Sequence, residues 1–375
     1  MDKLYFLFKP TRVINWMYMV QKAPFILFFI FLTLSCDIDD SQHQRYEPIP
    51  VNIAVPAVFS QLLPEPQIPS DNPLTQQGVL LGRALFFERR LSADNSLSCA
   101  GCHRPNEGFS DQRRYSVGID GVAGFRNSMP IVNIAWNTKN KFNWDGSANS
   151  LEEQVLEPVT NEIEMHNTWA NVVATLQNDA NYLAKFEAAF GSPTISKELA
   201  AKALSQFIRT LVSGNSKFDR YLLGQTTLTP LEEEGLAVFL DENRGDCFHC
   251  HGSPSNPLWT DNDFHNNGLD ENFIDLGLGD ITGDPAQFGL FKSPSLRNLA
   301  FTAPYMHDGR FQTLDQVIDH YSEGLVYSPT IDPLMKTVSQ GGVQLSLQDK
   351  AALKAFLLSL SDPSLANNPA YQNPN

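Results

Sequence analysis

The chain has 375 residues and a formal net charge of −15, so its surface is predicted to be acidic and well solvated. This charge argues against nucleic acid as a partner, although an acidic face could steer a basic redox protein. The length allows two domains once any targeting segment is removed.

The first 36 residues are predicted to form an export signal. The apolar run FILFFIFLTLS follows Lys22 and is too short for a comfortable membrane span. It ends at Cys36 in LTLSC, a loose lipobox, so we expect a periplasmic lipoprotein whose membrane contact is a lipid on Cys36. The alternatives are an ordinary signal peptide or an N-terminal anchor with an unused cysteine, and translation could start at Met17 or Met19. Residues 37–69, which begin with the polar stretch DIDDSQHQRYEPIP, are predicted to be a tether.

A first domain is predicted for residues 70–220. It begins with NPLTQQGVLLGRALFF, whose apolar spacing is helical and whose N-cap is predicted to be Thr75. CAGCH follows at residues 99–103, and C-x-x-C-H is the attachment pattern of a c-type haem, in which two thiols bond the haem and the histidine binds iron. A single copy could also be a zinc knuckle or a redox pair. The residues predicted to hold this first haem are Cys99, Cys102 and His103.

The middle of the chain contains SKELAAKALSQFIRTLVSG, predicted to be an amphipathic helix that ends at Gly214. A second domain is predicted for residues 221–375, with the junction at 214–228. It begins with TTLTPLEEEGLAVFL, where Thr229 is the predicted N-cap. CFHCH follows, and a second motif without further nearby cysteines favours haem over zinc at both sites. The residues predicted to hold the second haem are Cys247, Cys250 and His251.

The end of the chain holds one more predicted helix, SLQDKAALKAFLLSL, and a tail from residue 362 that is expected to fray. Segments after the two haem motifs also match: SMPIVNIAW parallels KSPSLRNLAF, and WDGSANSLEEQV from Trp144 parallels HDGRFQTLDQVI from His307. Strand signals are sparse. The predicted fold is therefore mainly α, with two cytochrome-c-like domains related by an internal repeat, each holding one covalently attached c-type haem.

The duplicated motif and its flanks resemble the bacterial di-haem cytochrome c peroxidase and MauG family. The segments that carry the resemblance are LGRALFFERRLSADNSLSCAGCH, RNSMPIVN, NWDGSANSLEEQ, NEIEM, FKSPSLRNLAFTAPYMHDGRFQTL and IDHYSEG. The resemblance implies that hydrogen peroxide reacts at the N-terminal haem and that the C-terminal haem takes in electrons. It also implies a calcium ion between the domains, held by Asn127, Thr302 and Pro304, and one amide with two backbone carbonyls suits calcium.

The resemblance further implies that Trp144 lies between the haems and that Gln154 and Glu164 form a polar pair over the first haem. Glu164 sits among apolar neighbours in NEIEM, which could raise its pKa and suit it to move a proton between the two oxygens of peroxide. From the residues alone, Glu164 could equally be a solvated loop carboxylate, Trp144 a core aromatic and Gln154 a surface residue.

The two haems are predicted to differ in their sixth ligands. Peroxidases of this family carry a histidine that caps the first iron at rest, and the matching position here is Ile119, which cannot bind iron. The first iron is therefore expected to be open without reductive activation. At the second iron the matching position is Tyr321, an anionic donor that favours ferric iron, as in MauG. His320 is the alternative ligand, and Met306 and Met335 are less favoured.

Three functions are compatible with these patterns. The first is a peroxidase that reduces hydrogen peroxide to water with electrons from a small cytochrome c or cupredoxin. The second is a MauG-like enzyme that uses peroxide to oxidise residues of a protein substrate, which Ile119 and Tyr321 favour. The third is a non-catalytic di-haem electron carrier, which is disfavoured because carriers normally close both irons.

Overall fold

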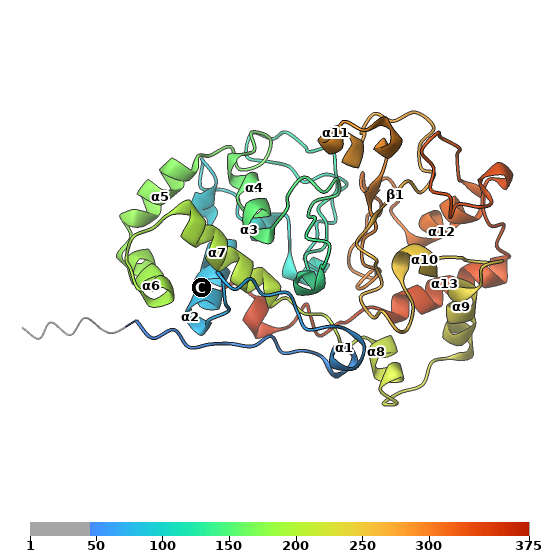
Figure 1. The fold of residues 1–375 in the computed structure, drawn as a ribbon, viewed down its shortest axis with the longest axis horizontal. Helices are drawn as coiled ribbons and strands as arrows, with labels where there is room; N and C mark the ends of the chain where they lie inside the picture. Colours follow the sequence, from blue (N-terminus) through green and yellow to red (C-terminus); the bar gives the residue numbers. More distant parts are fainter. Residues whose placement is uncertain (1–45, 375) are drawn as a thin grey trace, which may run out of the picture. The chain divides into compact units, whose positions relative to one another are not determined.

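Residues 46–374 are described in a computed structural model of the chain. The predicted export signal, Cys36 and both alternative start positions lie outside these residues. Within 46–374, no helix is long and apolar enough to cross a membrane. The described chain is mostly helical, with one antiparallel pair of two-residue strands, which agrees with the mainly α class predicted from the sequence (Figure 1).

The helices fall into two groups along the chain. In Figure 1 the helices α2 and α5 to α7 gather on one side of the described chain and α9, α10, α12 and α13 on the other. The elements up to residue 209 are α1 (Ala57–Leu62), α2 (Gln76–Phe86), α3 (Leu151–Gln154), α4 (Glu157–Thr160), α5 (Trp169–Gln177), α6 (Ala180–Phe190) and α7 (Lys197–Arg209). The later elements are α8 (Lys217–Leu222), α9 (Pro230–Leu240), α10 (Phe248–His251), β1 (Phe264–His265), α11 (Leu278–Thr282), β2 (Phe291–Lys292), α12 (Leu314–Glu323) and α13 (Leu347–Ser359).

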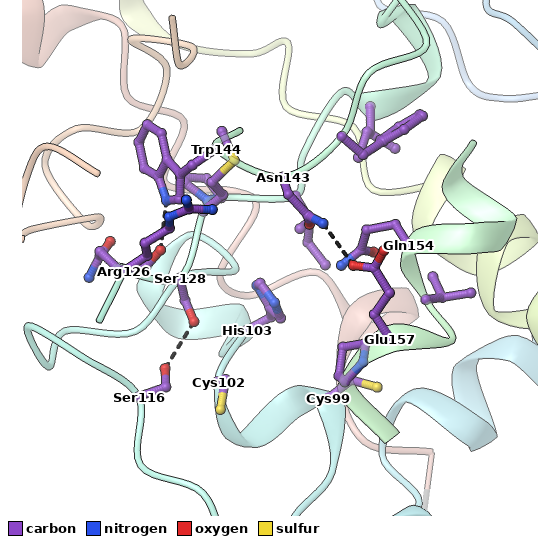
Figure 2. A pocket seen from close by; sticks show the side chains of 18 of the residues that line it. Cys99, Cys102, His103, Ser116, Arg126, Ser128, Asn143, Trp144, Gln154 and Glu157 are labelled. Atoms are coloured by element: carbon purple, nitrogen blue, oxygen red, sulfur yellow. Dashed lines mark hydrogen bonds between the residues drawn. The ribbon is translucent and has the colours of Figure 1, made fainter. Parts of the chain in front are cut away.

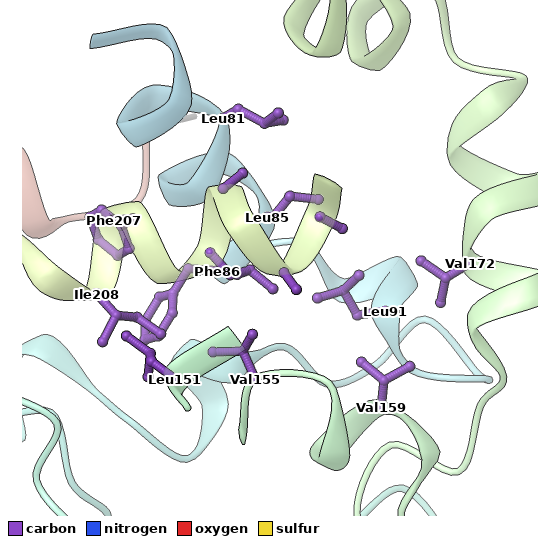
Figure 3. Packing of buried hydrophobic residues seen from close by; sticks show 14 of the residues in the cluster. Leu81, Leu85, Phe86, Leu91, Leu151, Val155, Val159, Val172, Phe207 and Ile208 are labelled. Atoms are coloured by element: carbon purple, nitrogen blue, oxygen red, sulfur yellow. The ribbon is translucent and has the colours of Figure 1, made fainter. Parts of the chain in front are cut away.

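The first hydrophobic core forms where α2 crosses α7. Gly82 allows this close approach, because a Cβ there would lie 1.9 Å from the carbonyl oxygen of Ala203. Apolar side chains from α2 and α7 then interdigitate with those of α3, as close packing requires (Figure 3). The labelled members of this core are Leu81, Leu85, Phe86, Leu91, Leu151, Val155, Val159, Val172, Phe207 and Ile208.

The second hydrophobic core forms where α9 crosses α13. Gly235 allows the close approach of these two helices, as Gly82 does in the first core, because a Cβ there would lie 2.0 Å from the carbonyl oxygen of Ala352. The rings of Phe239 and Trp259 both pack on Phe356, with centroids 5.2 and 5.5 Å away. Each half of the chain therefore centres on one helix pair with a glycine at its crossing. The domain boundary near residue 220 stays a prediction.

The helix starts expected from the sequence are confirmed, but one helix end is not. Thr75 and Thr229 are N-caps whose side chains accept hydrogen bonds from the first turns of α2 and α9. The helix expected to continue to Gly214 ends at Arg209. The next residues leave the helix because they bond elsewhere: Asn133 donates from its side chain to the carbonyl oxygen of Ser213 at 2.9 Å.

Two segments expected to be loose are packed. In the segment predicted to be a tether, Phe59 is fully buried and meets Trp136 edge-on, with ring centroids 5.0 Å apart. In the tail expected to fray, Tyr371 donates a hydrogen bond to the carbonyl oxygen of Thr210 at 2.7 Å, and Leu365 joins the first core. Both expectations were wrong for these residues, because polar composition along a segment does not reveal a few buried anchors.

Candidate active site

The first C-x-x-C-H motif opens onto a cavity of about 390 Å³. Cys99 lies in a short 3₁₀ turn, Cys99–Gly101, which places both thiols and the imidazole of His103 on the cavity wall (Figure 2). Nδ1 of His103 lies 3.1 Å from the carbonyl oxygen of Phe109, so Nδ1–H donates and Nε2 keeps its lone pair. Burial lowers the pKa of His103, which keeps the imidazole neutral and suited to bind iron.

The residues predicted to act on peroxide line this same cavity. Trp144, Gln154 and Glu164 all contribute to its wall. Oε1 of Glu164 accepts a hydrogen bond of 2.6 Å from the side chain of Asn161, which fixes the carboxylate. Burial raises the pKa of Glu164, as expected for a carboxyl group removed from water. The structure therefore brings together a partly buried carboxyl group, an amide and the first haem motif.

Sequence reasoning missed a second carboxylate in this cavity. Glu157 begins α4 and lies beside Gln154, and Asn143 donates a 2.8 Å hydrogen bond to it (Figure 2). Burial also raises the pKa of Glu157. The signal that could have found it is its spacing, since Glu157 stands three residues after Gln154, across the two-residue turn that joins α3 to α4.

The position expected to hold a capping histidine does not line the cavity, although it borders it. Ile119 is absent from the cavity wall, and its backbone N–H donates to the carbonyl oxygen of Glu164 at 2.9 Å. Within residues 46–374, His103 is the sole histidine that lines this cavity. The next histidine along the chain, His166, is half exposed and pairs with Asp120 at 2.5 Å. The described structure thus offers no imidazole for the open side of the first cavity.

The second C-x-x-C-H motif lines another cavity, of about 220 Å³. Cys247, Cys250 and His251 occupy its wall around α10, and Nδ1 of His251 lies 3.2 Å from the carbonyl oxygen of Pro294. Burial lowers the pKa of His251 to about 4, so this imidazole is neutral as well. Thiols and a neutral imidazole on one turn fit a covalently held haem at both cavities.

Tyr321 lines the second cavity, whereas His320 does not. The Tyr321 hydroxyl oxygen accepts a 3.1 Å hydrogen bond from the side chain of Asn267, and burial raises the pKa of Tyr321 to about 12. His320 points elsewhere, with Nε2 donating to the backbone oxygen of Asn267 at 3.2 Å. Met306 and Met335 also line the cavity, and the Met306 sulfur lies 3.6 Å from the same Asn267 amide.

The two cavities share a wall that contains Trp144, Asn127 and Lys292. Trp144 donates from Nε1 to the carbonyl oxygen of Asn127 at 2.7 Å, which fixes its ring. The Asn127 N–H in turn donates to the carbonyl oxygen of His307 at 2.7 Å. Trp144 therefore lines both cavities, and its place between two haems stays a prediction.

The residues expected to hold calcium line one cavity. Asn127, Thr302 and Pro304 all line the second cavity. Within 46–374, no group of three histidine, cysteine, aspartate or glutamate side chains could hold a metal ion, so a calcium site would depend on amide and carbonyl oxygens. The calcium ion stays a prediction.

Comparisons with known proteins agree on one family. The model of a family described as di-haem cytochrome c peroxidase matches residues 76–227. The chain is 37% identical over 304 residues to methylamine utilization protein MauG of Methylophilus methylotrophus, covering 79% of this chain and 86% of that protein. It is 32% identical over 342 residues to cytochrome-c peroxidase IdrP1 of Pseudomonas sp. (strain SCT), covering 82% and 87% of the two chains.

Solved structures give the same picture. A crystal structure of a MauG-like protein associated with microbial copper homeostasis matches with a TM-score of 0.77 and 36% identity, covering 86% of this chain and 99% of that chain. The diheme peroxidase BthA from Burkholderia thailandensis E264 matches with a TM-score of 0.69 and 22% identity, covering 79% and 89%, which is a likeness of fold.

Proposed function

Because the chain belongs to the di-haem cytochrome c peroxidase and MauG family, we propose that it reduces hydrogen peroxide to water with electrons from a small cytochrome c or cupredoxin. One observation carries the proposal: the partly buried carboxyl group of Glu164 lines the cavity of the first haem motif, and Trp144 lines both that cavity and a second one with its own haem motif. This arrangement supports a division of roles, in which peroxide would react at the first cavity and electrons would enter at the second.

The chain's residues divide the work between holding the haems and moving protons. When bound, the two haems supply irons that take electrons from the donor and pass them to peroxide. In this proposal His103 and His251 would bind the irons and Tyr321 would close the second iron, which their places on the cavity walls support. One peroxide takes up two electrons and two protons and yields two waters. Glu164 accepts a proton from one oxygen of peroxide and delivers it to the other, while Gln154 and Asn161 orient the reactants.

The second candidate is a MauG-like oxidation of residues on a protein substrate. Two observations favour it: Tyr321 lines the second cavity, and Ile119 leaves the first without a cap. The 37% identity to a MauG protein agrees with this alternative. Both candidates use the same cavities and the same Glu164.

We also infer that the two halves are internal repeats. The matching glycine contacts of Gly82 with Ala203 and of Gly235 with Ala352 support this inference. So do the two turns that follow, where bridges join Phe142 to Ala148 and Tyr305 to Phe311 with the same spacing.

Steady-state assays test the proposed activity. The holoprotein, mixed with reduced cytochrome c and hydrogen peroxide, is expected to oxidise many donor molecules per enzyme, with two donors oxidised for each peroxide consumed. A non-catalytic carrier would exchange electrons with cytochrome c but leave the peroxide concentration unchanged, and that result would contradict the proposal.

Tyr321→Phe is expected to remove the low-spin ferric signal of the second haem or to replace it with that of another ligand. Met306 is the expected replacement because its sulfur lies on the same wall, 3.6 Å from the amide that bonds Tyr321. Electron paramagnetic resonance of the oxidised protein measures this change. His320→Ala is the matched control and is expected to leave the signal in place. The assignment is wrong if only the His320 variant alters the spectrum.

A further inference from the structure

Lys292 is buried in the wall between the two cavities. It ends β2, only 6% of its surface is exposed, and it lines both cavities. Its backbone N–H donates to the carbonyl oxygen of Trp144 at 2.9 Å, which ties it to the residue that separates the haem motifs. A lysine at this depth is uncommon unless a partner neutralises it.

The other buried cations of the described chain are paired with carboxylates. Within residues 46–374, three lysine or arginine side chains are buried: Arg209, Lys292 and Arg297. Both arginines form two-bond pairs, Arg209 with Glu152 at 2.6 and 2.9 Å and Arg297 with Asp219 at 2.6 and 2.8 Å. Lys292 breaks this pattern.

The partners of Lys292 within the described chain are neutral. Its ammonium group donates to the carbonyl oxygen of Lys141 and lies 5.7 Å from the centre of the Phe142 ring. Burial lowers the pKa of Lys292 to about 8, with no carboxylate of the described chain acting against this shift. An ammonium group has three donors, so a carbonyl alone leaves capacity for an anionic acceptor in the cavity.

A haem brings its own anions. It carries two propionate carboxylates, and the C-x-x-C-H motifs place one haem in each cavity. We propose that the ammonium group of Lys292 binds a haem propionate at the wall that the two cavities share. This proposal rests on the two-haem function above and adds a residue that neither motif contains.

The charge of Lys292 would also tune the haem that it contacts. A nearby cation stabilises the reduced iron, which carries one positive charge fewer than the oxidised iron. Lys292 therefore raises the reduction potential of that haem and favours electron transfer towards it. Because the site is shielded from water, this effect is expected to exceed that of a surface charge.

The test is a spectroelectrochemical titration of both haems in the holoprotein. Lys292→Met removes the charge and keeps much of the side-chain length, and it is expected to lower the reduction potential of at least one haem. Lys292→Arg keeps the charge and is expected to stay closer to the wild type. Lys139→Met is the matched control, because Lys139 is half exposed and pairs with Asp263 at the surface. Its shift is expected to be smaller.

Mass spectrometry of the wild type distinguishes a failure of the Lys292 proposal from a failure of the proposed two-haem function. A wild type without two covalent haems would contradict the proposed function itself. With two haems present, Lys292→Met potentials equal to the wild-type values would overturn the role of Lys292 alone. If Lys292→Met does not assemble with two haems while Lys292→Arg does, the charge is required at this wall, as proposed. If neither Lys292→Met nor Lys292→Arg assembled with two haems, the site would require the shape of the lysine side chain and not its charge. That result would also overturn the proposal.

Discussion

Glu164→Gln is expected to slow the reaction with peroxide by about a hundredfold to ten-thousandfold, the usual cost of losing a general acid–base group. The substitution keeps the shape of the side chain and its neighbour Asn161, but glutamine cannot accept the proton that the carboxylate must move. Rapid mixing of the oxidised holoprotein with peroxide, followed by absorbance, measures the rate. Both haems should remain attached and the resting spectrum should be nearly unchanged.

The pH dependence gives the same residue a second test. Glu164 must be ionised to accept the first proton, so the rate falls as the pH drops through its pKa. Because burial raises the pKa of Glu164, this loss begins at a higher pH than for an ordinary glutamate. The acidic limb should disappear in the Gln variant.

Glu157→Gln is the matched control for Glu164→Gln. Glu157 lines the same cavity, burial raises its pKa too, and it also accepts a hydrogen bond from an amide side chain, that of Asn143. The proposed mechanism, however, assigns the proton transfer to Glu164 and gives Glu157 no part in it. Its loss is expected to slow the reaction less. If Glu164→Gln reacted at the wild-type rate, Glu164 would be a structural carboxylate, and the proton would have to move through Gln154 and water.

The double variant Cys99→Ala, Cys102→Ala is expected to lose the first covalent haem and, with it, the reaction with peroxide. Both sulfurs line the first cavity, and neither cysteine is in a disulfide. Mass spectrometry of the denatured protein should show one haem per chain in place of two, and peroxide turnover should fall to the background rate.

The corresponding double variant at the second haem motif, Cys247→Ala with Cys250→Ala, tests whether the two haems have different roles. This variant should also carry one covalent haem, but the first cavity remains intact, so its oxidised form should still react with peroxide while electron uptake from the donor fails. Equal behaviour of the two double variants would contradict the division of labour. Two haems retained in either variant would contradict the attachment sites.

The sequence predicted those features that depend on short spacing. The C-x-x-C-H turns, the Thr75 and Thr229 caps and the helix starting after Ser346 all form as expected, because each is decided within a few residues. The end of α7 was not predicted, because Asn133 draws residues 211–213 into bonds with a distant loop. The packed tail depends in the same way on Tyr371 reaching the end of α7.

Among the cavity residues, too, those whose position depends on long-range packing were not predicted from the sequence. Glu164 was expected through a family resemblance, whereas Glu157 and Lys292 were missed. In a single sequence a glutamate in a short helix or a lysine before a serine reads as a solvated charge, and only the fold shows that each lines a cavity. Burial of a charge is a property of long-range packing, which local spacing does not report.

The state of the first iron in the fully oxidised holoprotein tests the central claim most directly. The described structure offers no histidine other than His103 at the first cavity, so one iron should be open before any electron arrives. Electron paramagnetic resonance should show a high-spin ferric signal beside a low-spin one, and cyanide should bind without added reductant. Two low-spin haems at rest, with cyanide binding only after reduction, would contradict the account.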